Sequence, residues 1–246
     1  MSGPGGGEQR RGELARALAA LRERIAAACA VAGRDAAEVR LLAVTKTFPA
    51  IDVALLSDLG LTDFAENRDQ EATVKVPEFA GLRPATVARW HMVGHVQRNK
   101  ARSVVGWSDE VQSVDSARLA EALAKATGTA IQAGERSTEL DVLVQASIDG
   151  DPKRGGCRLS ELPKLAEIVT RSGVLRLRGL MAVAPLGADP AAAFERLAAA
   201  VERLRRDYPG ARTLSSGMSA DLEQAIAHGS TCVRVGTALL GGRPLA

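Results

Sequence analysis

The chain has 246 residues, of which 46% are hydrophobic and only 3% aromatic, and its formal net charge is +3. This length fits one large α/β barrel domain or two small domains, with a core built from Ala, Leu and Val. The basic cluster "RNKAR" at 98–102 lies in a helical pattern without an RNA-binding aromatic motif or a zinc-finger spacing. We therefore expect no nucleic-acid partner.

The cysteine content points to a reducing compartment. The three cysteines, Cys29, Cys157 and Cys232, are far apart and form no CxxC pair. An odd number at this spacing argues against a disulfide framework or a zinc site and favours a cytoplasmic protein. No apolar run is long enough to cross a membrane, so we expect no membrane partner either.

The first predicted elements are a tail and a helix. Residues 1–12 are rich in glycine and polar side chains, which predicts a disordered tail without the features of a signal peptide. Residues 13–33, "ELARALAALRERIAAACAVAG", predict a helix that ends at Gly33. No linker interrupts the pattern after the tail, so we expect a single domain over residues 13–246.

Apolar runs and helical segments alternate along the rest of the chain. The runs that predict strands lie at 39–45, 62–65, 88–94, 110–115, 140–147, 177–184, 211–216 and 231–236. The clearest helical segments lie at 116–127, 159–173, 189–208 and 219–229. About eight strand–helix units in roughly 250 residues are typical of a (β/α)8 TIM-type barrel. A doubly wound open sheet is the alternative, but no GxGxxG follows the first strand.

Two polar residues follow the first two predicted strands. Lys46 ends the apolar run in "LLAVTKTFPA" (41–50), and Asn67 lies in "AENRDQE" (65–71). A lone lysine at a buried strand end usually extends its amine to water. The sharper alternative is an amine that forms a Schiff base with an aldehyde. Both residues fall at the carboxyl ends of strands, where barrels carry their sites.

The loops after the seventh and eighth strands are candidates for phosphate binding. The loop "SSGMSAD" offers the hydroxyls of Ser215 and Ser219, and "VGTALLGG" offers the bare backbone of Gly236 and the hydroxyl of Thr237. Free N–H groups at a helix start favour an anion. For either loop alone, the simpler interpretation is that these serine, threonine and glycine residues form helix caps and turns. Because the two loops follow adjacent strands, a phosphate site becomes as good an interpretation as caps and turns.

Arg234 is the third unusual residue at this rim. In "CVRVG" its side chain takes the face opposite to Val233 and Val235. Every strand of a closed barrel is buried on both faces, so the guanidinium needs an acceptor, such as a ring nitrogen of the same ligand. A lysine for a Schiff base, a phosphate cup and an arginine beside a ring together match pyridoxal 5′-phosphate (PLP).

Over nearly the whole chain after the tail, the sequence resembles the YggS/PROSC family of PLP-binding homeostasis proteins. The matching stretches are "LLAVTK", "FAENRDQE", "WHMVGHVQRNK", "VQSVD", "RGLMAVAP" and "LSSGMSADLEQAIAHGSTCVRVGTALLG". The sequence departs from the family pattern at Ala65, where glycine is usual, and at Ser216, where methionine is usual. The change at Ser216 could alter the packing around the phosphate.

The resemblance implies a barrel like the N-terminal domain of alanine racemase. It implies that Lys46 forms the Schiff base with PLP, that Arg234 faces the pyridine nitrogen and that Asn67 lies close to the cofactor. It further implies that the phosphate is lined by Ser215, Ser219, Gly236 and Thr237.

His91 and His95 form an HxxxH pattern, which could bind zinc on a helix. Gly94 and the strand-like run around it break the helical geometry. We therefore expect packing or supporting roles for both histidines.

The site chemistry favours a PLP carrier over an enzyme. Arginine can only donate, so the ring nitrogen stays unprotonated and the ring is a weaker electron sink. Two-sided racemisation also needs a second base, and the chain ends at Ala246, shortly after the eighth strand. We expect a monomeric, non-catalytic protein of PLP homeostasis that buffers PLP or delivers it to PLP-dependent apo-enzymes.

Two enzymatic alternatives stay open. One is a small PLP-dependent racemase or related enzyme that uses Tyr208 or a histidine as the second base. The weaker one is an aldolase with a bare Schiff-base lysine, which would leave Arg234 without a ring partner.

Overall fold

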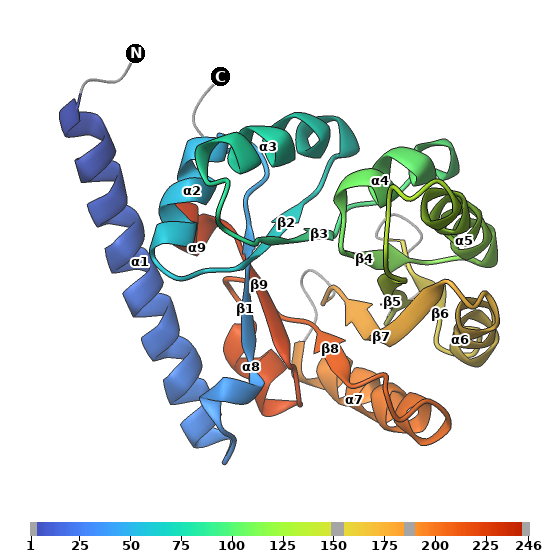
Figure 1. Ribbon diagram of the computed structural model, residues 1–246. Helices are drawn as coiled ribbons and strands as arrows, with labels where there is room; N and C mark the ends of the chain where they lie inside the picture. Colours follow the sequence, from blue (N-terminus) through green and yellow to red (C-terminus); the bar gives the residue numbers. More distant parts are fainter. Residues whose placement is uncertain (1–3, 149–154, 185–189, 243–246) are drawn as a thin grey trace.

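Eight parallel strands form a closed barrel in the computed structural model, which describes residues 4–148, 155–184 and 190–242 (Figure 1). The strands are hydrogen-bonded in the order β4-β3-β2-β1-β9-β8-β7-β5, and the pairing of β4 with β5 closes the ring. The predicted (β/α)8 barrel is thereby confirmed. The barrel strands are β1 (Arg40–Val44), β2 (Asp63–Glu66), β3 (Arg89–Met92), β4 (Glu110–Val114), β5 (Leu140–Ser147), β7 (Leu175–Ala182), β8 (Thr213–Ser215) and β9 (Cys232–Val235).

One further strand was not predicted. The two-residue strand β6 (Cys157–Arg158) pairs in parallel with the end of β5, at Ala146 and Ser147. It follows the predicted strand at 140–147 and precedes the next helix. A two-residue strand is too short to show the period-two pattern from which strands are predicted.

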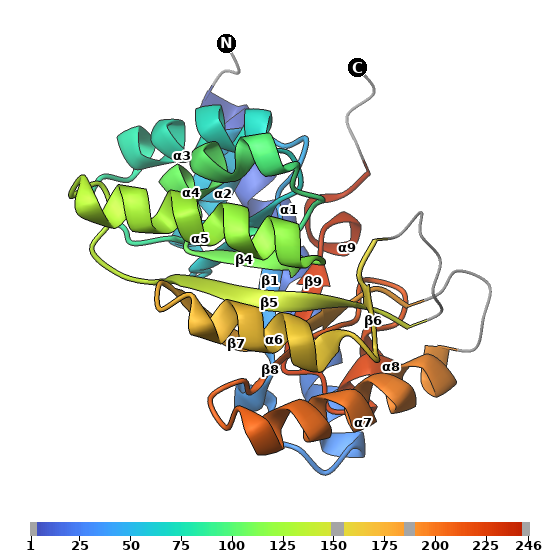
Figure 2. The same cartoon turned by 90° about the vertical axis from the view of Figure 1, so that its right-hand side faces the viewer.

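Helices surround the strands, as the two views show (Figures 1 and 2). The first helix, α1, packs along α2, α8 and α9 rather than following a strand. Among the described residues, none of the helices is both long and apolar enough to span a bilayer. The helices are α1 (Pro4–Val31), α2 (Ala50–Asp58), α3 (Asp69–Leu82), α4 (Ala101–Trp107), α5 (Ala117–Gln132), α6 (Leu162–Arg171), α7 (Pro190–Asp207), α8 (Leu222–Ala227) and α9 (Thr237–Leu240), with the 3-10 turns η1 (Ala36–Glu38) and η2 (Arg98–Lys100).

The N-terminal segment differs from its prediction. A disordered tail is predicted for residues 1–12, but α1 begins at Pro4, so the prediction is wrong from that residue onward. Residues 1–3 of the predicted tail lie outside the described part of the chain. The Arg10 guanidinium donates to both carboxylate oxygens of Asp52, at 3.1 and 2.7 Å, and to the backbone oxygen of Leu240 at 3.0 Å. These tertiary bonds anchor the early helix, and composition alone does not reveal them.

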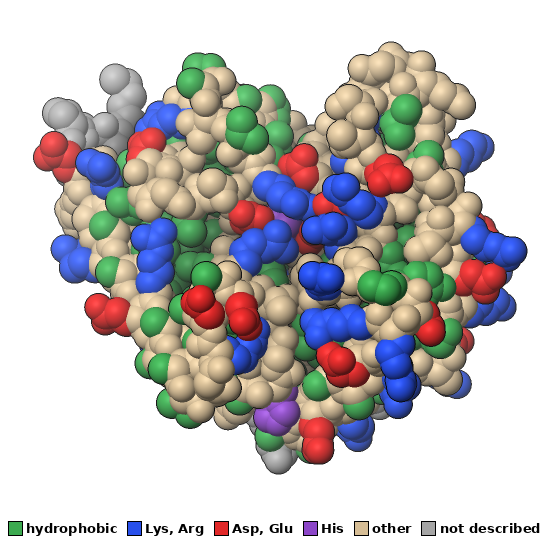
Figure 3. Space-filling model, turned by 60° about the horizontal axis from the view of Figure 1, so that its bottom comes forward, with side chains coloured by type: hydrophobic (Ala, Val, Ile, Leu, Met, Phe, Trp, Pro, Cys, Tyr) green, Lys and Arg blue, Asp and Glu red, His purple; other side chains and the backbone are tan. Residues whose placement is uncertain are grey.

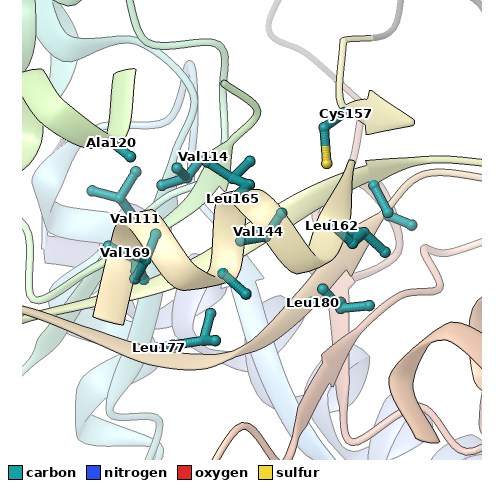
Figure 4. Packing of buried hydrophobic residues seen from close by; sticks show 14 of the residues in the cluster. Val111, Val114, Ala120, Val144, Cys157, Leu162, Leu165, Val169, Leu177 and Leu180 are labelled. Carbon is teal, nitrogen blue, oxygen red and sulfur yellow. The ribbon is translucent and has the colours of Figure 1, made fainter. Parts of the chain in front are cut away.

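The apolar core lies between the barrel and its helices. Leu162, Leu165 and Val169 of α6 share one helix face and point toward the strands, where they meet Val144 of β5 and its neighbours (Figure 4). Full burial of one such side chain contributes about 1.5–3 kcal/mol. This packing fixes the helices on the barrel and leaves the loops at the carboxyl ends of the strands to form a site.

Candidate functional site

A cavity of about 450 Å³ opens at the carboxyl ends of the barrel strands. Segments that are far apart in the sequence meet here, as expected for the site-bearing end of such a barrel. Apolar side chains also line the cavity, among them residues of β1, of β7 and of the loops after β1, β3 and β8. Six of the seven predicted site residues line the cavity, namely Lys46, Asn67, Ser219, Arg234, Gly236 and Thr237.

Lys46 follows the end of β1 and is half-buried in the cavity wall. Its amine has no hydrogen bond or ion pair with any residue that the structure describes. The next residue, Thr47, has a φ of 69°, which is a strained value for a β-branched residue. The Thr47 N–H donates to a carboxylate oxygen of Glu71. The chain therefore turns sharply behind an amine that is free to meet a ligand.

A buried ionic cluster holds the backbone on both sides of Lys46. The Lys75 ammonium on α3 donates to Glu66 Oε1 and to Glu71 Oε1, both at 2.7 Å, and to the backbone oxygen of Thr45 at 2.8 Å. Lys75 and Glu66 are almost fully buried. Burial raises the pKa of Glu66, although Lys75 opposes this shift. Because Thr45 and Thr47 are both hydrogen-bonded to this cluster, the backbone of Lys46 is held in place from both sides.

Sequence reasoning did not find this Lys75 cluster. The i, i+4 spacing of Glu71 and Lys75 indicates a helix-surface ion pair. The unexpected partner is Glu66, which lies at the end of β2 and is fully buried.

Asn67 is placed by a close approach between two loops. A Cβ atom on Gly94 would lie only 2.0 Å from the backbone oxygen of Asn67. Only glycine lets the loop after β3 come this near to the loop after β2. Gly94 therefore has a structural role in shaping the cavity wall next to Asn67.

The two loops predicted to bind phosphate both reach the cavity. In the loop after β8, the N–H groups of Ser219 and Ala220 find no acceptor within the part of the chain that the structure describes. In the loop after β9, a Cβ on Gly236 would come 3.3 Å from the backbone oxygen of Val44, so a larger residue would crowd β1. Thr237 is exposed and offers its hydroxyl. Unpaired backbone N–H groups in such turns suit an anion.

Ser215 is the predicted phosphate residue that the structure places elsewhere. It ends β8, is fully buried and does not line the cavity. Its hydroxyl accepts from Arg234 Nη1 at 2.8 Å and donates to Gln112 Oε1 at 2.7 Å. A hydroxyl has one hydrogen, and this one is already donated to Gln112. In this structure the Ser215 hydroxyl therefore has no hydrogen left for a phosphate, and its predicted phosphate contact stays a prediction.

Arg234 lies in the cavity wall but is 95% buried, with a relative exposure of 5%. Besides Ser215, its guanidinium reaches the backbone oxygen of Ala182, with a distance of 2.8 Å from Nη2. Ser215 and the Ala182 backbone are thus two acceptors for the Arg234 guanidinium that the sequence alone does not identify. A guanidinium has five N–H donors, so donors remain for a ligand in the cavity.

The two histidines occupy different surroundings, and neither lines the cavity. His91 is buried between Asp63 and Glu110, at 3.0 and 3.1 Å. Burial alone would lower the pKa of His91, but the hydrogen bonds to the two carboxylates raise it above its ordinary value. His95 is largely exposed, and its Nδ1 is 3.7 Å from a carboxylate oxygen of Asp115. Among the described residues, no three His, Cys, Asp or Glu side chains gather as a metal site would require.

The closed barrel, with its cavity at the carboxyl ends of the strands, places the protein in the class of alanine racemase-type barrels. A family model described as "Alanine racemase, N-terminal domain" matches residues 17–244. The chain belongs to this family, and within it to the pyridoxal phosphate homeostasis proteins. It is 47% identical over 240 residues to the pyridoxal phosphate homeostasis protein of Mycobacterium leprae, covering 94% of this chain and 93% of that protein.

Other relatives extend the comparison. The pyridoxal phosphate homeostasis protein of Escherichia coli is 39% identical over 234 residues, covering 94% of this chain and 97% of that protein. The structure of PipY from Synechococcus elongatus, solved with PLP bound, has a TM-score of 0.76 and 32% identity, and the match covers 93% of this chain and all of PipY. Alanine racemase from Corynebacterium glutamicum has a TM-score of 0.67 at 14% identity, which shows a shared fold; the match covers 96% of this chain and 62% of the racemase.

Proposed function

We propose that this protein binds PLP in the rim cavity and buffers it or delivers it to PLP-dependent apo-enzymes without turning over amino acids. The observation that carries the proposal is the meeting of an unpaired lysine, a buried arginine and two loops with free donors in one cavity of about 450 Å³. This volume lies in the usual range of small-molecule sites. The names of the relatives at 39–47% identity and the PLP-bound PipY structure support the same ligand.

The residues present fit the chemical groups of PLP. When bound, PLP supplies an aldehyde that reacts reversibly with an amine and a ring that withdraws electrons. Lys46 would provide that amine, and Arg234 would donate to the ring nitrogen. The free N–H groups of Ser219 and Ala220 and the hydroxyl of Thr237 would bind the phosphate. The apolar part of the cavity lining would contact the ring.

Arg234 beside the ring nitrogen would keep that nitrogen unprotonated and weaken the ring as an electron sink, but such a site can still support racemisation. What favours a carrier over a racemase is the lack of a second base at the cavity within the described part of the chain. The residues considered as a second base are Tyr208 and the three histidines, His91, His95 and His228, and none of them is among the described residues that line the cavity. His91 is instead held between two carboxylates inside the barrel.

The proposal is tested by two assays on one preparation of PLP-loaded protein. Incubation with L- or D-alanine should give no steady racemisation or transamination, whereas an apo-enzyme in excess should regain activity as it takes up PLP. The matched control is Lys46→Ala protein treated with PLP in the same way. Multiple turnovers by the wild type that disappear in Lys46→Ala would identify an enzyme and overturn the carrier proposal.

A further inference from the structure

An unbroken run of hydrogen bonds crosses the interior of the barrel. It starts at Arg234 on β9, passes through Ser215 on β8 and Gln112 on β4, and ends at Glu110, also on β4. The distances are 2.8 Å from Arg234 Nη1 to Ser215 Oγ, 2.7 Å from Ser215 Oγ to Gln112 Oε1, and 2.8 Å from Gln112 Nε2 to Glu110 Oε1. All four side chains are buried. We call this set the axial chain.

The direction of every bond in the axial chain is determined by its first member. A guanidinium can only donate, so Ser215 accepts from Arg234 and gives its one hydrogen to Gln112. The Gln112 amide must then present its oxygen to Ser215 and its NH₂ group to Glu110. The chain therefore runs from a cation in the cavity wall to a carboxylate, with no member free to reverse.

The carboxylate end of the axial chain is itself held by cations. Besides Gln112, Glu110 faces His91 Nδ1 at 3.1 Å, Arg89 at 3.1 Å and Arg40 at 3.6 Å. Burial would raise the pKa of Glu110, but the hydrogen bond from His91 and the nearby charges lower it to about 2. Glu110 is thus ionised at neutral pH and is held by groups that lie near the amino ends of the strands.

The axial chain answers a physical problem at Arg234. Within the described residues this nearly buried cation has no carboxylate within salt-bridge distance. Hydrogen-bond chains polarise their members in a low-dielectric interior, so a donor chain that ends on an anion stabilises the cation at its start. Bonds from Nη1 and Nη2 to two different acceptors, Ser215 and Ala182, also prevent the planar guanidinium from rotating.

We propose that Ser215 and Gln112 are positioning residues for Arg234, which hold its guanidinium so that its remaining N–H groups meet the ring nitrogen of the ligand. The proposal rests on the proposed function, because it assumes that PLP occupies the cavity. It assigns Ser215 to the ring side of the ligand rather than to the phosphate.

The test compares two ligands, PLP and its 1-deaza analogue, in which a C–H group replaces the ring nitrogen. Wild type should bind PLP more tightly than the analogue. Ser215→Ala should weaken PLP binding by about tenfold, the value of one hydrogen bond to a charged group, and should leave the affinity for the analogue unchanged. Dissociation constants come from ligand absorbance or fluorescence titrations, and thermal unfolding of the ligand-free variant checks the fold.

A matched control and a second variant keep the outcome decisive. Thr237→Val, on the phosphate side, should weaken both ligands by the same factor. If Ser215→Ala does not fold, Ser215→Cys carries the same comparison, because it keeps the side-chain volume and offers only a weak acceptor. Equal losses for both ligands in the Ser215 variant, or no loss at all, would overturn the positioning role. Wild type that binds neither ligand would instead contradict the proposed function.

Discussion

The two ends of the barrel treat charge in opposite ways. At the amino ends of the strands, arginines and carboxylates are joined in ion pairs, and Figure 3, which brings the bottom of the molecule forward, shows side chains of both signs gathered together. The paired residues are Arg40, Arg89 and Arg176 with Asp63, Glu110 and Asp141. At the carboxyl ends, Lys46 and Arg234 line a cavity without a carboxylate partner among the described residues.

This difference separates stability from binding on the same set of strands. Cations that are already paired cannot attract a ligand, whereas unpaired cations in a cavity favour an anionic one. The Lys75 cluster is an intermediate case, because its ion pairs lie beside the cavity and hold the backbone on which Lys46 stands. The comparison predicts different outcomes for substitutions at the two ends.

The largest effect is expected at Lys46. Lys46→Ala should abolish the covalent attachment of PLP, so that the protein is colourless after gel filtration, while its melting temperature stays near that of wild type because the amine has no protein partner. The measurements are the visible absorbance of PLP-treated protein before reduction and the ligand that stays covalently attached after borohydride, which removes the colour. Lys164→Ala, which replaces an exposed lysine on α6, serves as the control and should be yellow before reduction and keep the ligand after it. PLP that remains fixed to Lys46→Ala after reduction would contradict the assignment.

The next effect concerns stability at the carboxyl end. Lys75→Met should lower the free energy of unfolding by about 3–5 kcal/mol, since it leaves buried Glu66 without its cation. Arg171→Met breaks the exposed pair with Glu167 and should change stability by only about 0–1 kcal/mol. Urea unfolding of both ligand-free variants measures the difference. Equal destabilisation by the two substitutions would show that the buried Lys75 cluster contributes no more to the free energy of unfolding than the exposed pair.

A smaller effect is expected at the phosphate side of the cavity. Thr237→Val should weaken PLP binding by roughly ten- to a hundredfold, which corresponds to the loss of one charge-assisted hydrogen bond of about 1.5–3 kcal/mol. Binding of pyridoxal, which lacks the phosphate, should hardly change. Thr170→Val on α6 is the control and should affect neither ligand. A matching loss for pyridoxal would argue against a phosphate contact at Thr237.

The smallest effect is a pH dependence that arises at the amino end. Burial would raise the pKa of Asp63 and Glu110, but hydrogen bonds from His91 lower both to about 2. Their stabilising contribution is therefore present above the ordinary pKa of about 4 and is lost as the pH falls toward 2. His91, whose pKa is raised, contributes below about pH 6.5 and loses that contribution as the pH rises through its folded pKa.

This prediction is checked by melting temperatures of the ligand-free protein between pH 2 and pH 9. The contribution of the three groups should be greatest between about pH 4.5 and pH 6.5. In Asp63→Asn the fall on the acid side should be shallower than in wild type. An identical pH profile in both proteins would mean that the pairing of Asp63 with His91 does not affect stability.

Most of the fold could be predicted from the sequence, because the eight strand runs are apolar, short and separated by helical patterns. The errors fall where tertiary contacts decide. Glycines near the N-terminus favour a flexible tail, yet Arg10 finds Asp52 and Leu240. Ser215 is predicted to meet the ligand, yet at the end of β8 its hydroxyl turns toward Gln112 and does not line the cavity.

The site was predictable to the extent that it depends on position along the strands. Lys46, Asn67 and Gly236 follow strand ends, and any closed parallel barrel brings such residues to one rim. What single-sequence patterns do not reveal is which buried polar groups become partners. The Lys75 cluster and the axial chain each join side chains from different elements, and their pairing depends on barrel register and helix packing.

The fixed backbone around Lys46 has a kinetic consequence. Thr45 and Thr47 are both anchored to the Lys75 cluster. Thr47 also has a strained backbone conformation, so the turn after Lys46 has little freedom to change. Adaptation to a ligand then falls to the four flexible bonds of the lysine side chain, which rearrange in picoseconds to nanoseconds. If Lys46 holds PLP as we propose, capture and release of PLP need not wait for the backbone of Lys46 to move.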